Sequence, residues 1–333
     1  MVPVYFTKNI SAEGILIILK KIRSGLKGKT GIKLHFGEHG NKNYVSPELV
    51  KPLAEILDAA MVETNALYVC KRRYTESHLE TALSHGFDFA PIDILDAEGE
   101  SEYPADLKHY SKVKTGRNFG NYDSFLILSH FKGHILMGFG GAIKNVSMGF
   151  ASPAGKMALH ASSIPEYNPD LCTECGKCIR QCPGEAISIR PLHISSQKCI
   201  GCGKCIGVCP EHAFGVPWGS TEKPVFIERV CDYAKGFTRL RPMVFINVLA
   251  KISKDCDCDS AAAPPFIDDI GILASEDMLA LERASLDLVN KAYGSNDTFL
   301  ELNGVGSSHL FEYAESIGLG SADYEFVDIS DSK

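Results

Sequence analysis

The sequence predicts an α/β fold with a largely parallel sheet, interrupted by a small inserted α+β module that carries most of the cysteines. Three observations support this prediction. Short apolar runs typical of strands alternate with helix-length segments on both sides of the middle of the chain. The length, 333 residues, is enough for about two domains. Eight of the twelve cysteines fall between Cys172 and Cys209, where the alternation stops.

The first half of the chain carries clear helix-start signals. Ser11 is expected to cap a helix that continues to about residue 24, because serine favours the N-cap position. Ser46 and Pro47 should open a second helix, which we expect to reach residue 61 and to kink or restart at Pro52. A third helix is predicted over residues 75–85. Strands are predicted at residues 2–6, 31–36, 66–70, 91–95 and 124–129.

The alternation resumes after the cysteines. A helix is predicted over residues 224–237, and Ser275 is expected to cap a second one that ends near residue 291. Glu276 and Asp277 would lie in its first turn, where carboxylates interact favourably with the helix dipole. Strands are predicted at residues 243–250, 270–274 and 324–329.

Composition and charge exclude several classes of protein. Apolar residues make up 45% and charged residues 23%, as in ordinary globular proteins. The longest aliphatic run, residues 15–19, is far shorter than the roughly 20 residues of a membrane helix. No leader pattern is visible, so we expect a cytoplasmic protein. The net charge of -7 argues against nucleic acid as a partner, because binding phosphates requires an excess of positive charge.

The cysteines form an internal repeat. Two runs of the form C-x2-C-x2-C-x3-C-P begin 27 residues apart, counted from Cys172 to Cys199, and each ends in a proline, Pro183 or Pro210. In a reducing compartment such cysteines indicate metal binding or thiol chemistry rather than structural disulfides. The first run comprises Cys172, Cys175, Cys178 and Cys182, and the second comprises Cys199, Cys202, Cys205 and Cys209.

This spacing predicts two 4Fe–4S clusters with ligands exchanged between the runs. Three closely spaced thiolates hold one cluster, and the fourth cysteine of each run reaches the other cluster. Zinc ribbons also use C-x2-C pairs, but zinc does not require four cysteines followed by proline, or a duplicate of that run. The predicted ligand sets are Cys172, Cys175, Cys178 and Cys209 for one cluster, and Cys199, Cys202, Cys205 and Cys182 for the other.

Residues 169–215 resemble a bacterial two-cluster ferredoxin throughout. We therefore divide the chain into an α/β domain formed by residues 1–165 and 217–333, and a ferredoxin-like insert over residues 166–216. Few large apolar residues lie in the insert, so the clusters would supply much of its core.

A second candidate site precedes the insert. His134, Lys144 and His160 flank a glycine-rich stretch that follows a predicted strand, the place where α/β proteins put their sites. The histidines could ligate a metal or move protons, and the lysine could act as a nucleophile or contact an anion. The alternative is a glycine-rich turn with solvated side chains. We take these three residues as the candidate catalytic residues.

Further residues at predicted strand ends complete the list of candidates. His35, His39 and His130 could belong to an extra metal site, although such histidines are often found in surface loops. Cys256 and Cys258 lie between carboxylates and could bind metal, form a redox disulfide or occupy a turn. Neighbouring carboxylates are expected to raise the pKa of both thiols, which weakens a nucleophilic role.

Several of these motifs together resemble a known family. Residues 33–38, 129–134, 138–145 and 255–258, with the cysteine repeat between them, are similar to a large group of uncharacterised iron–sulfur-centre proteins of bacteria and archaea, catalogued as a domain of unknown function. The resemblance covers nearly the whole chain and implies two 4Fe–4S clusters and an α/β body. Asp259 stands where many members carry a further cysteine, which weighs against a thiolate-rich third site.

A fainter similarity is to the N-terminal domain of nickel-pincer lactate racemases. In that domain a histidine, a Gly-Phe-Ser-Gly-Gly-x-Lys stretch and a later histidine bind the pincer cofactor. His134, Lys144 and His160 fall in a similar order here, with Ala142 as a departure from the pattern. The resemblance implies a site at these positions, with room for an additional metal or small cofactor, but not racemisation.

These observations predict an iron–sulfur protein that transfers single electrons to a redox active site in the α/β domain. The electrons would be exchanged with a redox partner protein or a small-molecule substrate. The alternatives are a non-catalytic electron carrier or adaptor, and clusters that serve only to hold the insert together.

Overall fold

The centre of the molecule is an eight-stranded sheet that is parallel except for one strand. The computed structural model describes residues 1–160, 164–189 and 191–330. Only β15 runs against its neighbours, so the predicted largely parallel sheet is confirmed. In order across the sheet, the strands are β16 (Tyr324–Asp328), β1 (Val2–Thr7), β15 (Gly271–Ser275), β14 (Met243–Leu249), β7 (Ser124–His130), β2 (Thr30–Lys33), β3 (Ala60–Glu63) and β4 (Ile92–Ile94).

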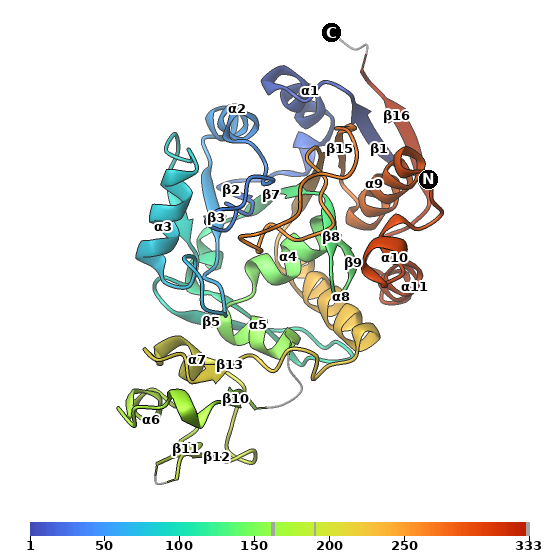
Figure 1. Cartoon of the computed structure of the whole chain (residues 1–333). Coiled ribbons are helices and arrows are strands. Elements are labelled where there is room, and N and C mark those ends of the chain that lie inside the picture. The colour runs from blue at the N-terminus through green and yellow to red at the C-terminus, as the bar shows by residue number, and fades with distance from the viewer. Residues whose placement is uncertain (161–163, 190, 331–333) are drawn as a thin grey trace.

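Helices cover both faces of this sheet (Figure 1). Strand β7 is buried along its whole length and faces a separate core on each side: Phe125 and Ile127 pack in one, and Leu126 and Leu128 in the other. The first face is covered by α4 (Ala142–Phe150), α8 (Lys223–Leu240), α9 (Met278–Tyr293), α10 (Thr298–Asn303) and α11 (Ser308–Ser316), and the second by α1 (Ala12–Ile22), α2 (Pro47–Leu57) and α3 (Thr75–Ser84).

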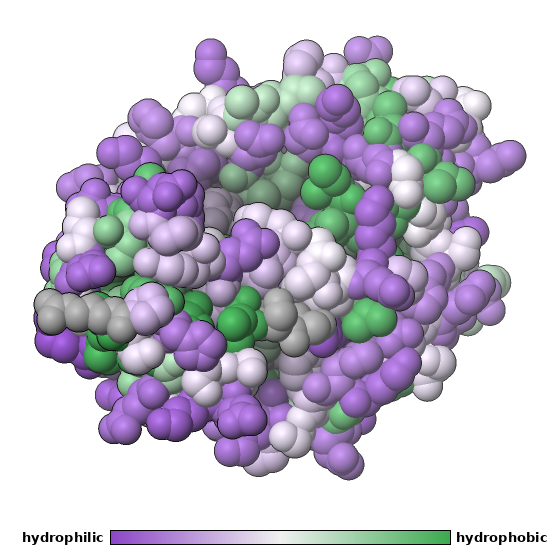
Figure 2. All heavy atoms as spheres, turned by 60° about the horizontal axis from the view of Figure 1, so that its bottom comes forward, coloured by the Kyte–Doolittle hydropathy of each residue, from purple (hydrophilic) through white to green (hydrophobic). Residues whose placement is uncertain are grey.

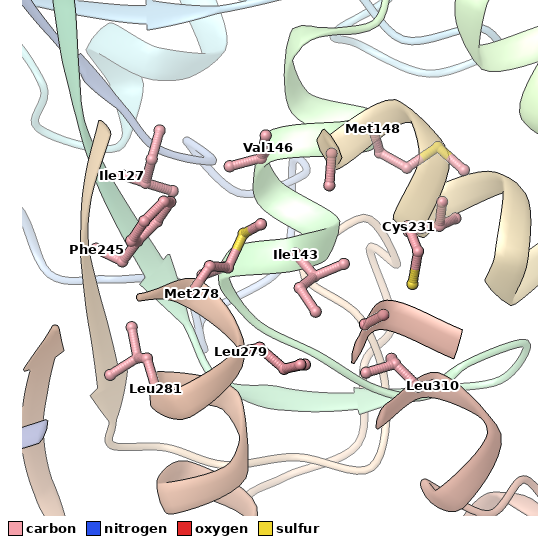
Figure 3. Close-up of a cluster of buried hydrophobic side chains, with 14 of the residues drawn as sticks. Ile127, Ile143, Val146, Met148, Cys231, Phe245, Met278, Leu279, Leu281 and Leu310 are labelled. Atoms are coloured by element: carbon pink, nitrogen blue, oxygen red, sulfur yellow. The ribbon is translucent and has the colours of Figure 1, made fainter. Parts of the chain in front are cut away.

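Helix α4 is the centre of the first face. Figure 3 shows Ile143 and Val146 of α4 in one cluster with Ile127 and Phe245 of the sheet and with Met278 at the start of α9. All five side chains are at least nine-tenths buried. Burial of an aliphatic or aromatic side chain of this kind contributes about 1.5–3 kcal/mol. Helix α4 therefore has a fixed position, which matters because it also carries Lys144.

Several predicted elements differ from the structure at their ends. Helix α2 stops at Leu57, because Asp58 adopts a left-handed conformation, and it runs through Pro52 without a break. Helix α9 is capped by Asp277, whose carboxylate accepts the N–H groups of Leu279 and Ala280, and not by Ser275. Residues 66–70 form a loop and not a strand, because the strand of this region is β3, which lies upstream.

The remaining elements are short. Two hairpins, β5–β6 and β8–β9, follow the fourth and seventh strands along the chain. We call residues 166–216 the cysteine segment; it lies at one end of the molecule, beyond α5 (Figure 1). The hairpins are β5 (Glu100–Pro104) with β6 (Lys112–Gly116) and β8 (Lys132–His134) with β9 (Gly138–Gly140), and helix α5 spans Pro153–His160. Three 3-10 helices cover Arg23–Gly25, Arg117–Asn121 and Pro169–Leu171.

The described part of the cysteine segment contains two short α-helices, the 3-10 helix Pro169–Leu171 and two two-stranded sheets. Figure 2 looks toward the end of the molecule that carries it and shows a mostly hydrophilic surface with separate apolar patches. Within the described residues, no helix is long and apolar enough to span a membrane. The helices are α6 (Lys177–Arg180) and α7 (Lys204–Val208), and the strands are β10 (Glu166–Tyr167) with β13 (Phe214–Gly215) and β11 (Ile187–Ser188) with β12 (His193–Ile194).

Candidate functional site

A cavity of about 310 Å³, which we call the main cavity, opens where β2, β3 and β7 end. The carboxyl ends of parallel strands meet at one edge of a sheet, which is where α/β proteins bind ligands. At the rim, Ile135 and Trp218 are exposed over 71% and 52% of their surface. Apolar residues form much of the wall: Val45, Ala66, Leu67, Leu128, Leu136 and Met148.

Four cationic side chains line the cavity: Arg72, Lys132, Lys144 and Lys156. Arg72 is held by Glu38, with Nε and Oε2 3.0 Å apart. Lys156 Nζ donates to Thr64 Oγ1 at 2.5 Å and to the Asn65 carbonyl at 2.8 Å. These contacts fix the positive groups in place before any ligand arrives.

A buried ion pair lies at the end of β2 and β3. Lys33 Nζ is 2.6 Å from Glu63 Oε1, and both side chains are almost completely buried. The same ammonium donates to Asn145 Oδ1 at 2.9 Å, which ties β2 to helix α4. Burial lowers the pKa of Lys33, and the Glu63 carboxylate offsets only part of that effect. Glu63 also lines the cavity, so the carboxylate that pairs with Lys33 is part of the cavity wall.

Two histidines on the wall are fixed as hydrogen-bond donors. His35 Nδ1 accepts the Gly37 N–H at 3.0 Å, and His134 Nδ1 accepts the Leu136 N–H at 3.3 Å. Burial, and after it the nearby cations, holds the pKa of both imidazoles well below the usual value, so both are neutral. In a neutral imidazole the second nitrogen then carries the proton. Both rings therefore offer only Nε2–H to a ligand.

The third predicted catalytic histidine, His160, also lines the cavity. Its ring lies 5.0 Å from Phe226 and 4.6 Å from Trp218, measured between ring centroids. Burial and the charges of Lys144 and Lys156 lower its pKa to about 3, so it is neutral. Its Nδ1 is buried without a hydrogen-bond partner among the described residues. The structure thus brings His134, Lys144 and His160 together around one cavity.

The other predicted histidines do not gather into one cluster. His130 lines the cavity but is fully engaged: Nδ1 lies 2.7 Å from Asp257 Oδ1, and Nε2 lies 2.8 Å from the Ala250 carbonyl. His39 is exposed, while His35 faces the cavity. Among the residues that the structure describes, no three His, Cys, Asp or Glu side chains stand close enough to hold a single metal ion.

Cys256 and Cys258 lie side by side in the loop after β14. Their Sγ atoms are 2.7 Å apart, and Lys144 Nζ is 3.1 Å from Cys256 Sγ. The hydrogen bond from Cys258 and the charge of Lys144 hold the pKa of Cys256 well below the usual value, despite its burial. Asp257 raises the pKa of Cys256, as the sequence indicates, but the effects of Cys258 and Lys144 are larger.

Gly133 lets this loop approach the cavity. A Cβ at Gly133 would lie 2.1 Å from the Lys254 carbonyl oxygen, closer than any side chain can stand. The Gly133 N–H donates to the Ser253 carbonyl at 2.8 Å. Only glycine permits β8 and the loop to touch here, and this contact brings Cys258 to the cavity wall, with Cys256 beside it.

Three residues of the site carry no local sequence signal and are not predicted from the sequence: Arg72 and Tyr68 from the loop after β3, and Lys156 from α5. Lys132, on β8, belongs to the 129–134 motif, but the sequence assigns it no role in the site. Tyr68 links two parts of the site, because its hydroxyl accepts from Arg72 at 3.1 Å and donates to the Cys258 carbonyl at 3.2 Å. A buried lysine or arginine cannot be recognised until the fold shows what surrounds it.

In the cysteine segment, the eight cysteines of the repeat surround two small cavities, four around each. The two loops are structural copies: Gly176 and Gly203 both adopt left-handed conformations, with φ of 69° and 66°, at the starts of α6 and α7. One cavity is lined by Cys172, Cys175, Cys178 and Cys209, and the other by Cys182, Cys199, Cys202 and Cys205.

Backbone N–H groups point at several of these sulfurs. Ala186 donates to Cys182 Sγ at 3.3 Å, and Ala213 donates to Cys209 Sγ at 3.2 Å. The two contacts are equivalent in the repeat, because each donor lies four residues after the fourth cysteine of its run. Donors of this kind stabilise thiolates and tune the clusters that thiolates hold. This donor set fits an iron–sulfur cluster in each cavity.

Leu67 contacts both the cysteine segment and the main cavity. Leu67 lines the main cavity, and its Cδ1 lies 2.8 Å from the point where a side chain at Gly203 would begin. Gly203 lines the cavity of Cys182, Cys199, Cys202 and Cys205. Tyr74 makes a further contact, since its hydroxyl donates to the Gly207 carbonyl at 2.7 Å. The loop after β3 therefore joins the two sites.

The fold and the site define an α/β protein with a cation-lined cavity at the carboxyl edge of a mostly parallel sheet. Residues 30–287 match the family model described as a domain of unknown function (DUF362), and the chain belongs to that family. No curated protein matches the chain.

Six chains of solved structures are similar to it, and they include the following two. The lactate racemase apoprotein from Thermoanaerobacterium thermosaccharolyticum shares 11% identity at a TM-score of 0.46, over 88% of this chain and 58% of that one. A crystal structure of a protein from Thermotoga maritima shares 12% identity at a TM-score of 0.42, over 86% and 59%. The chain spans less than two thirds of the length of either structure.

Proposed function

We propose that the protein is an iron–sulfur oxidoreductase whose cysteine segment holds two 4Fe–4S clusters and transfers single electrons to a redox site in the main cavity. The cysteines grouped around each small cavity would be the ligands, with Cys209 and Cys182 exchanged between the two runs. When bound, such clusters supply one-electron transfer. A cluster places each thiolate on a different iron, so its ligands stand further apart than the ligands of a single ion.

The observation that carries this proposal is the contact through Leu67. The same side chain lies on the wall of the main cavity and against Gly203 of the cysteine segment. An electron leaving that end of the cysteine segment would have a route to the cavity through Leu67, which touches both sites. A carrier without an active site has no need of a cavity there, so the arrangement favours an oxidoreductase over an adaptor.

Reversible reduction tests this electron-transfer role. We expect anaerobic protein to lose visible absorbance on reduction at low potential and to regain it on reoxidation, with an unchanged circular dichroism spectrum. Clusters that only hold the insert together would not cycle in this way. Irreversible bleaching with loss of helical signal would contradict the proposal.

The chemistry of the cavity wall indicates the substrate class. Arg72, Lys132 and Lys144 carry positive charge, and His35 and His134 offer only N–H donors. A ligand that satisfies them must be an anion rich in acceptor oxygens, and the apolar remainder of the wall fits a hydrocarbon part. We therefore propose a small organic carboxylate as substrate, bound with its carboxylate toward the lysines.

Benzoate and its neutral isostere benzamide provide a direct test of the charge preference. Because buried cations gain most from a charged partner, we expect benzoate to bind at least about tenfold more tightly, a difference of about 1.4 kcal/mol. Isothermal titration calorimetry measures both affinities. Lys132→Met should remove most of the difference. Equal binding of the two compounds to the unmodified protein would contradict an anion site.

A further inference from the structure

The loop after β14 presents its two cysteines on one side and its aspartate on the other. Asp257 turns toward His130 and Lys132, with Oδ1 2.7 Å from His130 Nδ1 and Oδ2 3.5 Å from Lys132 Nζ. The Asp259 N–H donates to the Cys256 carbonyl at 2.9 Å, so residues 256–259 form a turn. Within this turn the Cys256 and Cys258 sulfurs lie 2.7 Å apart, and Cys258 is on the cavity wall.

The loop is held at further points along its length. The Glu38 N–H donates to the Asp257 carbonyl at 3.0 Å, and Asn41 Nδ2 donates to the Asp259 carbonyl at 2.8 Å. Tyr68 contacts the carbonyl of Cys258. Two thiols in a mobile loop would meet only occasionally, whereas here the backbone on both sides of Asp257 is fixed by residues of the α/β domain.

Three donors converge on the Cys256 sulfur. Lys144 Nζ lies at 3.1 Å, the Cys258 thiol at 2.7 Å and the Cys258 backbone N–H at 3.4 Å. Burial lowers the pKa of Lys144, but the two sulfurs more than offset burial, so its pKa is raised and it stays charged. The hydrogen bond to Cys256 and burial raise the pKa of Cys258 well above the usual value. The pair is therefore a thiolate beside a thiol.

We propose that Cys256 and Cys258 form a redox-active dithiol–disulfide pair in the wall of the main cavity. On oxidation the S–H bond of Cys258 breaks, an S–S bond forms, and the pair releases two electrons and one proton. Two one-electron acceptors, of the class proposed above for the cysteine segment, take the electrons. This electron route rests on the proposed function, but the disulfide itself does not.

The geometry favours this chemistry over a metal site. An S–S bond is about 2.03–2.05 Å long, so sulfurs 2.7 Å apart need only a small approach to bond. Lys144 places a positive charge directly beside Cys256, where a metal cation would be repelled. The pair would convert one-electron transfer into the two-electron chemistry that most organic substrates require.

Thiol trapping on the anaerobic holoprotein tests the pair. One sample is treated with the thiol oxidant diamide and one with dithionite; each is acid-quenched, denatured and labelled with N-ethylmaleimide. We expect the peptide that holds both cysteines to be unlabelled and two hydrogens lighter after diamide, and doubly labelled after dithionite. Two labels in both samples, or stoichiometric zinc that disappears in Cys256→Ser, would overturn the proposal.

Variants separate the pair from its surroundings. Cys256→Ser and Cys258→Ser should each abolish the internal disulfide, whereas Cys70→Ser, a half-buried cysteine outside the repeat and the pair, should leave it unchanged. Lys144→Met should slow alkylation of Cys256 by iodoacetamide in the native protein at least tenfold, because the thiolate loses its cation. An unchanged alkylation rate would remove Lys144 from this role.

Iron analysis of the same samples keeps the two proposals distinguishable. If the disulfide forms in protein that contains no iron, the proposal of a Cys256–Cys258 disulfide is supported and the proposed electron route through clusters is wrong. If the protein is rich in iron but the peptide never loses two hydrogens, the proposal of clusters is supported and the proposal of a Cys256–Cys258 disulfide is wrong. In Cys172→Ser/Cys182→Ser, reduction of the disulfide by dithionite should slow at least tenfold if the electrons pass through the cysteine segment.

Discussion

The double variant Cys172→Ser/Cys209→Ser is expected to keep about half of its iron, whereas Cys172→Ser/Cys182→Ser is expected to lose nearly all of it. The reason is the grouping of the cysteines in space: Cys172 and Cys209 line one small cavity, and Cys182 lines the other. Removing two ligands of one cluster leaves the second intact, while removing one ligand from each damages both. Iron per chain, measured after anaerobic purification, distinguishes the two variants.

The opposite pattern would show that each run binds its own cluster. In that case Cys172→Ser/Cys182→Ser would keep about half of the iron and Cys172→Ser/Cys209→Ser would lose it. Cys70→Ser is the matched control, because it removes a half-buried cysteine that lines neither small cavity. It should retain the full iron content.

Glu63→Gln is expected to destabilise the protein by about 3–5 kcal/mol, because it leaves a buried ammonium without its counter-charge. The Lys33 side chain is fully buried, and Glu63 Oε1 lies 2.6 Å from its Nζ. Burial already lowers the pKa of Lys33, and loss of the carboxylate lowers it further. A neutral amine costs less to bury than an ammonium. The loss of stability in Glu63→Gln should therefore be largest at low pH, where Lys33 is charged, and should shrink as the pH rises through the lowered pKa of Lys33. Urea unfolding across the pH range measures it.

A second variant separates the charge effect from a change of shape. Lys33→Met/Glu63→Gln removes the ammonium together with its partner, so it should recover much of the stability lost in Glu63→Gln. If the double variant is no more stable than the single variant, packing and not the buried charge is the cause. A loss below about 1 kcal/mol in Glu63→Gln would show that water reaches the pair.

The sequence predicts most of the central sheet because buried strands and capped helices leave local signals. Ser11 caps α1, and the apolar run of β7 lies where its composition indicates. The strand predicted over residues 66–70 fails for a physical reason. Short apolar runs indicate burial, not the structure that is buried. Ala66, Leu67 and Tyr68 are in a loop, and they line the main cavity.

The candidate site could be predicted only in part. His134, Lys144 and His160 share one stretch of sequence with a glycine-rich turn, so they are visible as a group. Arg72 comes from a distant loop and contributes by a contact that no local pattern encodes. The acidic neighbours of Cys256 predict a raised thiol pKa, but the structure lowers this pKa, in part because Lys144, 112 residues away in sequence, contacts its sulfur.

Iron and acid-labile sulfide, measured on protein purified without oxygen, test the central claim most directly. The proposed ligand sets predict about eight irons and eight sulfides per chain, with the broad visible absorbance of 4Fe–4S clusters. Colourless protein with about two zinc ions per chain and no sulfide would contradict the claim, and the repeat would then hold zinc.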